Sequence, residues 1–307
     1  MDPLLVITNS GAGGDDDEAL EAALQVLRSR TSVEVAATAD PGELDSVLHR
    51  AASRTIVVAG GDGSLHAVVR ALHRRRELTG RTLALVPLGT GNDFARTLGI
   101  PLDPRDAAEV VLRGTVRPID LLVDEVGEVV VNNVHIGAGA DAGRRGTPWK
   151  KRLGRIGVGP VNLGRLGYPI GALLTAVDPP TLRLRVSVDG RTVADVDEPV
   201  LMVALGNGST VGGGLALNPE ADPESGLIDV MVSRSVGPVA RWAYAVRLGH
   251  GSHARREDVV HLTGRSVSVS GEDFWCSADG EIYGPERHRS WHVEPSAYSL
   301  VLPRRTS

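Results

Sequence analysis

The chain has 307 residues, of which 42% are hydrophobic and 23% are charged, as in an ordinary soluble globular protein. A net charge of −5 and an aromatic content of 3% disfavour nucleic acid as a partner. A single cysteine, Cys276, excludes an intramolecular disulfide framework. Without a signal peptide or an apolar run of ~18 residues, the chain is predicted to be cytoplasmic.

The first hundred residues alternate between short apolar strands and amphipathic helices. Strands are predicted at residues 4–8, 33–37, 55–59 and 83–87, and helices at 15–30, from Pro41 onward and at 64–76. This alternation predicts a doubly wound, mostly parallel sheet with helices on both faces. Three glycine-rich loops, at residues 9–14, 60–63 and 89–92, fall at the carboxyl ends of these strands, where such sheets bind ligands.

The loop Gly60–Gly63 follows the buried strand IVVA and precedes a helix. Glycines at this point let backbone N–H groups approach a phosphate, and the helix N-terminus favours negative charge. The carboxylate of Asp62 would repel phosphate unless Mg²⁺ lies between them. The loop therefore indicates a magnesium–nucleotide site. The alternative is a plain Asp-Gly turn, which the following helix disfavours.

Beyond residue 120, short alternating strands separated by turn signals predict a second, β-rich domain, which we interpret as a sandwich. The last strand, at 297–303, is expected to return to the first domain. The predicted division is thus an α/β nucleotide-binding domain at 1–120, a β-sandwich domain at 121–288 and a returning segment at 289–307.

Two motifs carry a family resemblance. The first, GGDGS at Gly60–Ser64, resembles a phosphate-binding motif of diacylglycerol kinases, NAD kinases and phosphofructokinases. The second, PLGTGNDFAR at Pro87–Arg96, resembles the signature of the diacylglycerol kinase catalytic family, which includes sphingosine and ceramide kinases. Further matches follow in chain order: Ile119-Asp120, 130–142, 163–173, 206–230 and 279–281.

The resemblance implies a two-domain fold with ATP in the cleft between an α/β half and a β-sandwich half. It implies a lipid kinase that uses ATP and Mg²⁺ to phosphorylate diacylglycerol, giving phosphatidic acid, or a related lipid alcohol such as a sphingoid base. A peripheral location at an anionic membrane surface follows from such a substrate. The alternatives are a NAD kinase and a nucleotide- or lipid-binding homologue that has lost catalysis.

The resemblance also implies roles for individual residues. Asp62, Asp93 and Asp120 would organise a network of Mg²⁺ and water around the phosphates. Ser64 and Thr90 would donate hydroxyl hydrogen bonds to phosphate. The full set of expected nucleotide contacts is Asn9, Ser10, Gly11, Gly13, Thr38, Gly60, Gly61, Asp62, Gly63, Ser64, Thr90, Asn92, Asp93 and Asp120.

Asp279 and Glu281 match the catalytic Asp-x-Glu pair of the family. One carboxylate would accept the proton of the lipid hydroxyl while the other positions it. Because residues i and i+2 of a strand point to the same face, both carboxylates are expected to face one site. The alternative is a solvated Asp-Gly turn.

The chain departs from the family pattern in two loops. The usual Asn-Pro-x-Ser-Gly of the first loop is Asn9-Ser10-Gly11-Ala12-Gly13 here, which still permits close backbone approach to phosphate. Ser225 stands where bacterial members often have an Asp that helps to bind a structural Mg²⁺. That second metal site, expected at Asp222, Ser225 and Leu227, is weakened, although Asp222 or Glu224 could substitute.

A basic segment at residues 144–155 surrounds Trp149 with six cationic side chains: Arg144, Arg145, Lys150, Lys151, Arg152 and Arg155. Basic residues contribute about 1 kcal/mol each near an anionic bilayer, and tryptophan prefers the interface. We interpret the segment as a membrane-docking loop, with an ordinary solvated basic loop as an equal alternative. The oligomeric state is left open, with a homodimer as one option.

Overall fold

The computed structural model describes residues 3–9, 14–137 and 181–305, which form two compact units. Unit 1 comprises Met1–Leu121, Pro223–Gly226 and Glu294–Ser307; unit 2 comprises Leu122–Asp222 and Leu227–Val293. The predicted boundaries, at residues 120 and 288, did not assign Pro223–Gly226 to the first unit. The basic segment 144–155 lies outside the described residues.

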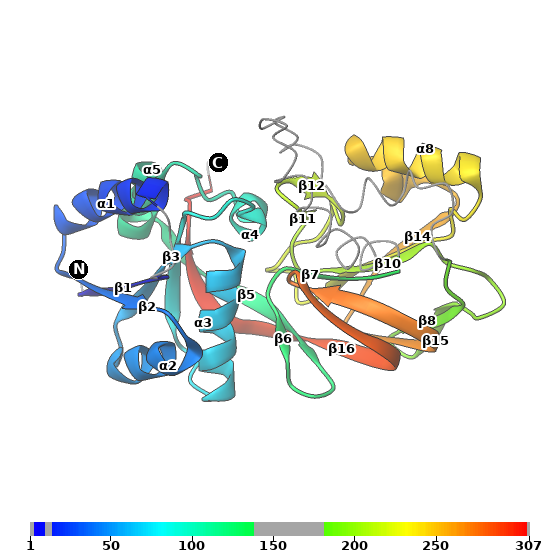
Figure 1. The fold of residues 1–307 in the computed structure, drawn as a ribbon, viewed down its shortest axis with the longest axis horizontal. Helices are drawn as coiled ribbons and strands as arrows, with labels where there is room; N and C mark the ends of the chain where they lie inside the picture. Colours follow the sequence, from blue (N-terminus) through cyan, green and yellow to red (C-terminus); the bar gives the residue numbers. More distant parts are fainter. Residues whose placement is uncertain (1–2, 10–13, 138–180, 306–307) are drawn as a thin grey trace, which may run out of the picture. The chain divides into compact units, whose positions relative to one another are not determined.

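Unit 1 is a parallel sheet with helices on both faces (Figure 1). Its strands lie in the order β2-β1-β3-β4, and the end of β16 adds to β4 through parallel pairs such as Leu300 with Leu83. Helices α1 and α5 cover one face, while α2 and α3 cover the other. The elements of unit 1 are β1 Leu4–Asn9, α1 Gly14–Arg28, β2 Val33–Thr38, α2 Pro41–Arg50, β3 Thr55–Gly60, α3 Asp62–Arg74, β4 Thr82–Pro87, α4 Asp93–Thr97, α5 Pro104–Arg113 and parts of β5 Thr115–Asp124 and β16 Glu281–Leu302.

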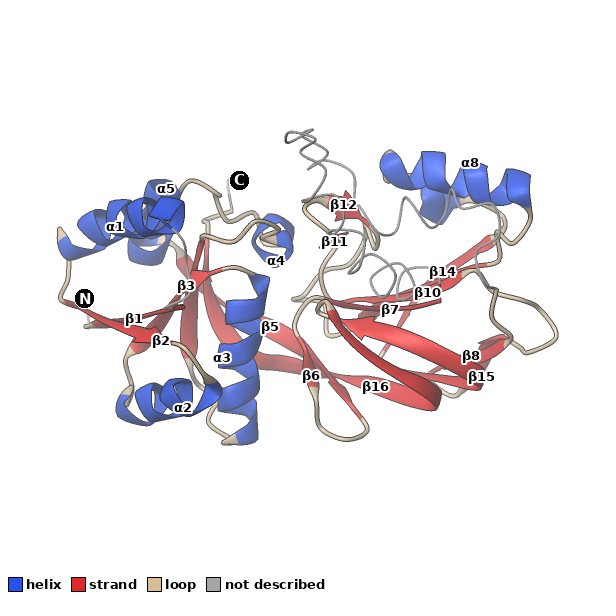
Figure 2. Ribbon diagram, viewed as in Figure 1, coloured by secondary structure: helices blue, strands red, loops and turns tan. Residues whose placement is uncertain are grey.

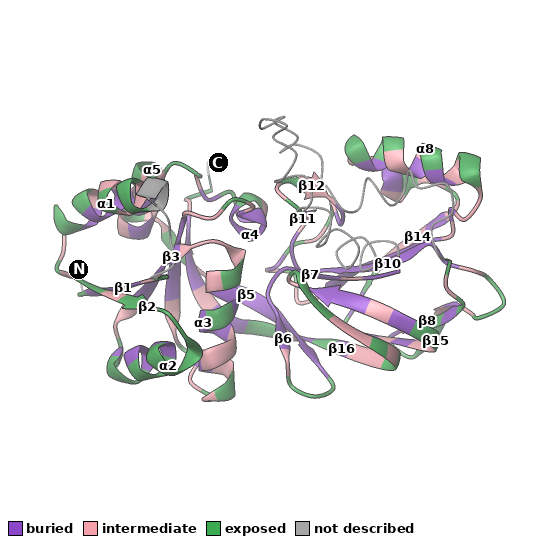
Figure 3. Ribbon diagram, in the orientation of Figure 1, coloured by how far each residue is buried: buried purple, intermediate pink, exposed green. Residues whose placement is uncertain are grey.

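Local signals explain where the helices begin. The Asp40 carboxylate accepts from the N–H groups of Gly42 at 2.8 Å and Glu43 at 2.9 Å, and Pro41 occupies the first turn. The Glu43 carboxylate in turn accepts at 2.7 Å from the N–H of Ala39, the residue before the N-cap, in an arrangement that resembles a capping box. Strands β1, β3 and β4 are buried along consecutive residues, as expected when helices cover both faces of a sheet (Figure 3).

Unit 2 is an antiparallel β-sandwich (Figure 2). Strand β15 pairs with β8 along Val267–Gly271 and with β7 along Cys276–Ala278, so that irregularities near Phe274 carry it from one layer to the other. The elements of unit 2 are β6 Val129–Val130, β7 Asn133–Gly137, β8 Leu184–Val188, β9 Arg191–Ala194, β10 Met202–Gly206, β11 Thr210–Val211, β12 Leu215–Ala216, β13 Ile228–Ser233, α8 Pro238–Gly249, the 3-10 helix η1 His253–Arg255, β14 Val259–Gly264, β15 Ser266–Ala278 and the remainder of β5 and β16. These observations confirm the predicted fold class.

The buried carboxylate of Asp120 ties three segments of unit 1 together. Its side chain is 1% exposed; Oδ1 accepts from the N–H of Ser296 at 2.8 Å and Oδ2 from that of Gly226 at 2.5 Å. The Asp120 N–H donates to the carbonyl of Pro223 at 2.8 Å. The short insertion Pro223–Gly226 is therefore anchored to β5 and β16 by charge-assisted hydrogen bonds.

Asp120→Asn is expected to lower the free energy of unfolding by about 2 kcal/mol, because its amide NH₂ would face a buried N–H donor. Urea denaturation measures this change. The matched control is Asp197→Asn, at an exposed position, which should change stability by less than about 0.5 kcal/mol. Equal stability of the two variants would contradict the anchoring role.

Two histidines predict a pH dependence of stability. Burial lowers the pKa of His135 to about 4, and burial likewise lowers the pKa of His253. Between about pH 6.5 and pH 4 the unfolded chain therefore binds protons that the folded chain does not. The free energy of unfolding is highest above pH ~6.5 and falls as the pH drops toward 4. At pH 5 the loss from His135 is about 2 kcal/mol.

The contribution of His135 is isolated by comparing urea midpoints of the wild type and His135→Gln at pH 7 and pH 5. The variant should lose less stability between these two values than the wild type does. An identical loss in both proteins would contradict the assignment.

Candidate functional site

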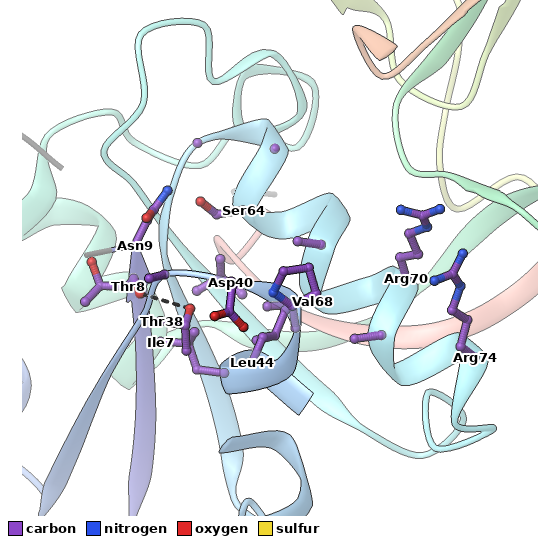
Figure 4. A pocket seen from close by; sticks show the side chains of 17 residues that line it. Ile7, Thr8, Asn9, Thr38, Asp40, Leu44, Ser64, Val68, Arg70 and Arg74 are labelled. Atoms are coloured by element: carbon purple, nitrogen blue, oxygen red, sulfur yellow. Dashed lines mark hydrogen bonds between the residues drawn. The ribbon is translucent and has the colours of Figure 1, made fainter. Parts of the chain in front are cut away.

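A pocket of about 480 Å³ lies in unit 1 at the carboxyl ends of β1 and β2 and along α3. Ser64, at the start of α3, and Asn9, at the end of β1, are at one end of the pocket (Figure 4). Arg70 and Arg74 project from α3 at the other end. Between them lie apolar residues such as Leu44 and Val68, together with the polar side chains of Thr38 and Asp40.

Five of the predicted contact residues line this pocket: Asn9, Thr38, Gly61, Gly63 and Ser64. The Thr38 hydroxyl donates to the carbonyl of Thr8 at 3.3 Å, which fixes it between two neighbouring strands. Thr90 is exposed and does not line the pocket. Ser10, Gly11 and Gly13 lie outside the described residues.

The loops after β3 and β4 meet backbone to backbone. A Cβ added to Gly89 would lie 2.6 Å from the Cα of Gly61, and one added to Gly61 would lie 3.0 Å from the Cα of Gly89. Neither position leaves space for a side chain. The N–H of Leu88 also donates to the carbonyl of Gly60 at 3.1 Å, so the two loops are held together as one unit.

Asp62 is the bridge between these loops. Its Oδ2 accepts from the N–H of Asp93 at 2.9 Å and its Oδ1 from the N–H of Phe94 at 3.0 Å, which caps the short helix α4. A Cβ at Gly91 would lie 3.2 Å from Asp62 Oδ2 and 3.3 Å from Asp93 Oδ2, so these two carboxylates converge on the Gly91 backbone.

Asn92 contributes a third oxygen to this loop. It has a left-handed backbone with φ of 50°, and its amide NH₂ donates to Gly89 O at 2.5 Å. Its Oδ1 is buried and accepts no hydrogen bond from the part of the chain that the structure describes. Two carboxylates and an amide oxygen form a donor set that suits Mg²⁺, which takes one or two protein carboxylates together with phosphate and water.

Asp120 has backbone partners of its own. Its carboxylate accepts from the N–H groups of Gly226 and Ser296, and among the described residues no three or more His, Cys, Asp or Glu side chains form a group that could hold a metal. Asp120 is thus a structural anchor, and the role beside the phosphates that the resemblance implies for Asp62, Asp93 and Asp120 stays a prediction.

The loop of the expected structural metal has its own anchors. Gly226 donates to Asp120, and the Glu224 carboxylate pairs with Arg117 at 3.0 Å and Arg305 at 3.3 Å. Asp222, Ser225 and Leu227 belong to this loop, where the described residues contain no group of three or more His, Cys, Asp or Glu side chains placed to bind a metal. Ion pairs with Arg117 and Arg305 hold Glu224 in the loop, and the weakened structural metal site stays a prediction.

Asp279 and Glu281 do not share a strand face, which corrects the sequence-based expectation. Asp279 and Gly280, with φ of 47° and 87°, form the tight turn between β15 and β16, and Ala278 pairs directly with Glu281. The Asp279 carboxylate accepts from the N–H groups of residues 131–133 at distances of 2.7, 2.9 and 3.1 Å. The turn is therefore not a solvated one, because Asp279 organises the segment that connects β6 to β7.

Glu281 is the exposed member of the pair. Its Oε2 accepts from the hydroxyl of Tyr283 at 2.7 Å, which orients the carboxylate without burying it. Glu281 is thus the more exposed of the two carboxylates.

The sequence reasoning missed a cluster of asparagines beside Asp279. Asn132 donates to the carbonyl of Thr210 at 2.9 Å, and Asn207 donates to the carbonyl of Val131 at 2.7 Å. Both are at most 6% exposed. The adjacent Asn-Asn pair in a strand and the Gly-Asn-Gly turn at 206–208 were the available signals, because asparagine is rare in buried strands without a hydrogen-bonding role.

Comparison with known proteins extends these observations. Residues 3–123 match the family described as "Diacylglycerol kinase catalytic domain", and residues 155–302 match "YegS C-terminal NAD kinase beta sandwich-like domain". A "Probable lipid kinase YegS-like" of Xanthomonas campestris pv. campestris (strain 8004) is 32% identical, over 94% of this chain and 92% of its own length. A relative of the same name from Stenotrophomonas maltophilia (strain K279a) is 33% identical, over 97% of this chain and 95% of its own length.

Among solved structures, a diacylglycerol kinase from Bacillus anthracis str. Sterne aligns with a TM-score of 0.73, at 22% identity and over 97% of this chain and 96% of that one. A second chain from the same organism reaches a TM-score of 0.77 at 24% identity, over 97% of both chains. These likenesses support the fold. Sequence identity over nearly the whole length, together with the two matched domains, establishes that this chain belongs to the family of YegS-like lipid kinases, which carry a diacylglycerol kinase catalytic domain.

Proposed function

We propose that this lipid kinase transfers the γ-phosphoryl group of ATP to the hydroxyl group of diacylglycerol, or of a closely related lipid alcohol. The observation that carries the proposal is the backbone contact of Gly61 with Gly89 beside the pocket along α3. The contact brings two loops without side-chain cover to the N-terminus of α3, where backbone N–H groups can approach a phosphate closely.

The pocket supports one orientation of the nucleotide. Its phosphates would lie against Gly61, Gly63 and the hydroxyl of Ser64, at the N-terminus of α3. The nucleoside would then extend along the pocket toward Arg70 and Arg74. A guanidinium group at that end can stack on a purine or donate to a ribose oxygen.

The loop at Asp93 fits a divalent cation. Asp93, Asp62 and the amide oxygen of Asn92 are the residues that would hold Mg²⁺, directly or through water. When bound, this ion offsets the negative charge of the phosphates during transfer. The Asp62 carboxylate also holds the loop in place, because it accepts hydrogen bonds from the backbone N–H groups of Asp93 and Phe94.

The acceptor hydroxyl needs a base as its oxygen attacks the γ-phosphorus and the bond from that phosphorus to the departing ADP oxygen breaks. The proton of the hydroxyl passes to a carboxylate. The exposure of Glu281 favours it as that carboxylate. The three backbone N–H bonds to Asp279 favour a positioning role, in which Asp279 sets the Asn132–Asn133 backbone and the turn that carries Glu281.

The test of the function uses purified protein, [γ-³²P]ATP with Mg²⁺, and mixed micelles that contain diacylglycerol, a sphingoid base or a lipid extract. Label in phosphatidic acid is the expected result. Label in NADP, when NAD is supplied, would favour the NAD kinase alternative. Binding of ATP without label in any acceptor would favour a homologue that has lost catalysis.

Glu281→Gln is expected to lower kcat by about 100-fold or more, because the amide cannot accept the proton. The free energy of unfolding should not change, since the side chain is exposed. Asp279→Asn should also abolish transfer and leave ATP binding intact, but it should lower stability because it places NH₂ against backbone donors. Glu257→Gln, at another exposed position, is the matched control. Full activity in Glu281→Gln would exclude this residue as the base.

Two glycine variants test the phosphate site. A Cβ at Gly63 meets nothing within 4 Å, whereas one at Gly89 collides with the Gly61 backbone. Gly63→Ala should therefore keep its stability and weaken ATP binding by at least about 10-fold, since only a bound phosphate would meet the new methyl group. Gly89→Ala should lose stability as well.

Isothermal titration calorimetry with ATP, combined with urea denaturation, separates these two outcomes. Unchanged ATP affinity in a stable Gly63→Ala protein would place the phosphates elsewhere.

A further inference from the structure

Helix α8 presents apolar side chains on two opposite faces. Its inner face packs Tyr244 and Leu248 into a core that includes residues of β10, β13 and β14. Its outer face, which we define as Val239, Trp242 and Val246, is 80%, 65% and 41% exposed. These positions follow the i, i+3, i+7 spacing of one helix face and lie on the side opposite Tyr244 and Leu248.

An exposed apolar stripe of this kind is unusual on a soluble protein. A helix that is apolar on both faces is normally buried, and an apolar patch left on the surface marks an interaction site. Among the described residues, no helix has the length and apolar character required to span a bilayer. The outer face of α8 therefore points to contact at a surface.

The charge around α8 identifies the kind of surface. From Arg234 to Arg256 the sequence contains five arginines, two histidines and no Asp or Glu, and Glu257 and Asp258 follow directly; the whole chain has a net charge of −5. Arg234 pairs with Glu198 and Arg256 with Asp258. Arg247 on α8 and Arg255 on η1 are exposed, and neither forms an ion pair within the described part of the chain.

We propose that the outer face of α8 docks on an anionic lipid bilayer, with the helix lying in the plane of the interface. Trp242 prefers the headgroup region, Val239 and Val246 enter the acyl boundary, and Arg247 and Arg255 contact anionic headgroups. The proposal deepens the proposed function, because a kinase for a lipid alcohol must bring its site to the membrane that holds the substrate.

A second copy of the chain is a less suitable occupant. A two-fold dimer through the outer face of α8 would place this acid-free, arginine-bearing segment against its own copy. Like charges would then face one another around the apolar centre, which opposes association. An anionic bilayer complements both the apolar and the cationic side chains.

Vesicle binding of the full-length protein, measured without ATP, tests the proposal. Vesicles of phosphatidylcholine with and without phosphatidylglycerol are the probes, and co-sedimentation gives the partition coefficient. V239S/W242S/V246S should lower binding to the anionic vesicles by at least about 10-fold. R247Q/R255Q should lower it by about 25-fold, or about 5-fold for each charge.

Matched controls carry the same kinds of change elsewhere. L102S/V116S/V126S removes three exposed apolar side chains, and R50Q/R191Q removes two exposed charges. Both controls should bind the vesicles as the wild type does, and thermal unfolding verifies that all variants are folded. Wild-type binding by V239S/W242S/V246S would overturn the proposal. So would a wild-type dimer that this variant converts to a monomer while vesicle binding is retained.

A kinase assay separates this proposal from the proposed function. With a short-chain diacylglycerol dissolved as monomers, V239S/W242S/V246S should match the wild type, whereas with diacylglycerol in anionic vesicles its rate should fall by about 10-fold. An equal fall in the rate of V239S/W242S/V246S with both forms of diacylglycerol would overturn the docking role. If no lipid is phosphorylated by the wild type, yet the variant loses vesicle binding, docking stands and the proposed function fails.

Discussion

The contact between Gly61 and Gly89 sets the geometry at the carboxyl ends of β3 and β4. Strands β3 and β4 are parallel neighbours, so their carboxyl ends meet at one edge of the sheet. Because neither glycine has a side chain, the loops touch through their backbones. That proximity brings the Asp62 carboxylate within reach of the amides of Asp93 and Phe94. The position of α4, the left-handed Asn92 and the wall of the pocket all follow from this single close approach.

Local sequence signals predicted unit 1 well, since they act over a few residues. The Asp40-Pro41-Gly42-Glu43 start of α2 has the capping bonds expected of it. Helix α5 begins with the same Asp-Pro signal at Asp103, and this helix was absent from the sequence-based prediction. Short continuous apolar runs were sufficient to predict these strands, because a sheet covered by helices on both faces buries consecutive residues.

The parts that could not be predicted depend on contacts between distant residues. Asp120 meets N–H groups that lie 106 and 176 residues further along the chain. No sequence pattern states which backbone amide a buried carboxylate will satisfy. At Asp279 the expected conformation was wrong, while its expected role stays a prediction. The alternation of side chains holds only within a strand, and an Asp-Gly pair with positive φ ends one strand and begins the next.

The path of the chain has a consequence for protein synthesis. The chain passes between the units at 121/122, 222/223, 226/227 and 293/294, and the strand that pairs with β4 on the side away from β3 comes from residues 299–300 of β16. A ribosome that has released the first 121 residues has therefore supplied an α/β layer that still lacks its final strand and the loop held by Asp120. Unit 1 is complete only after residues 294–302 have emerged, so its sheet cannot be completed before unit 2 has been synthesised.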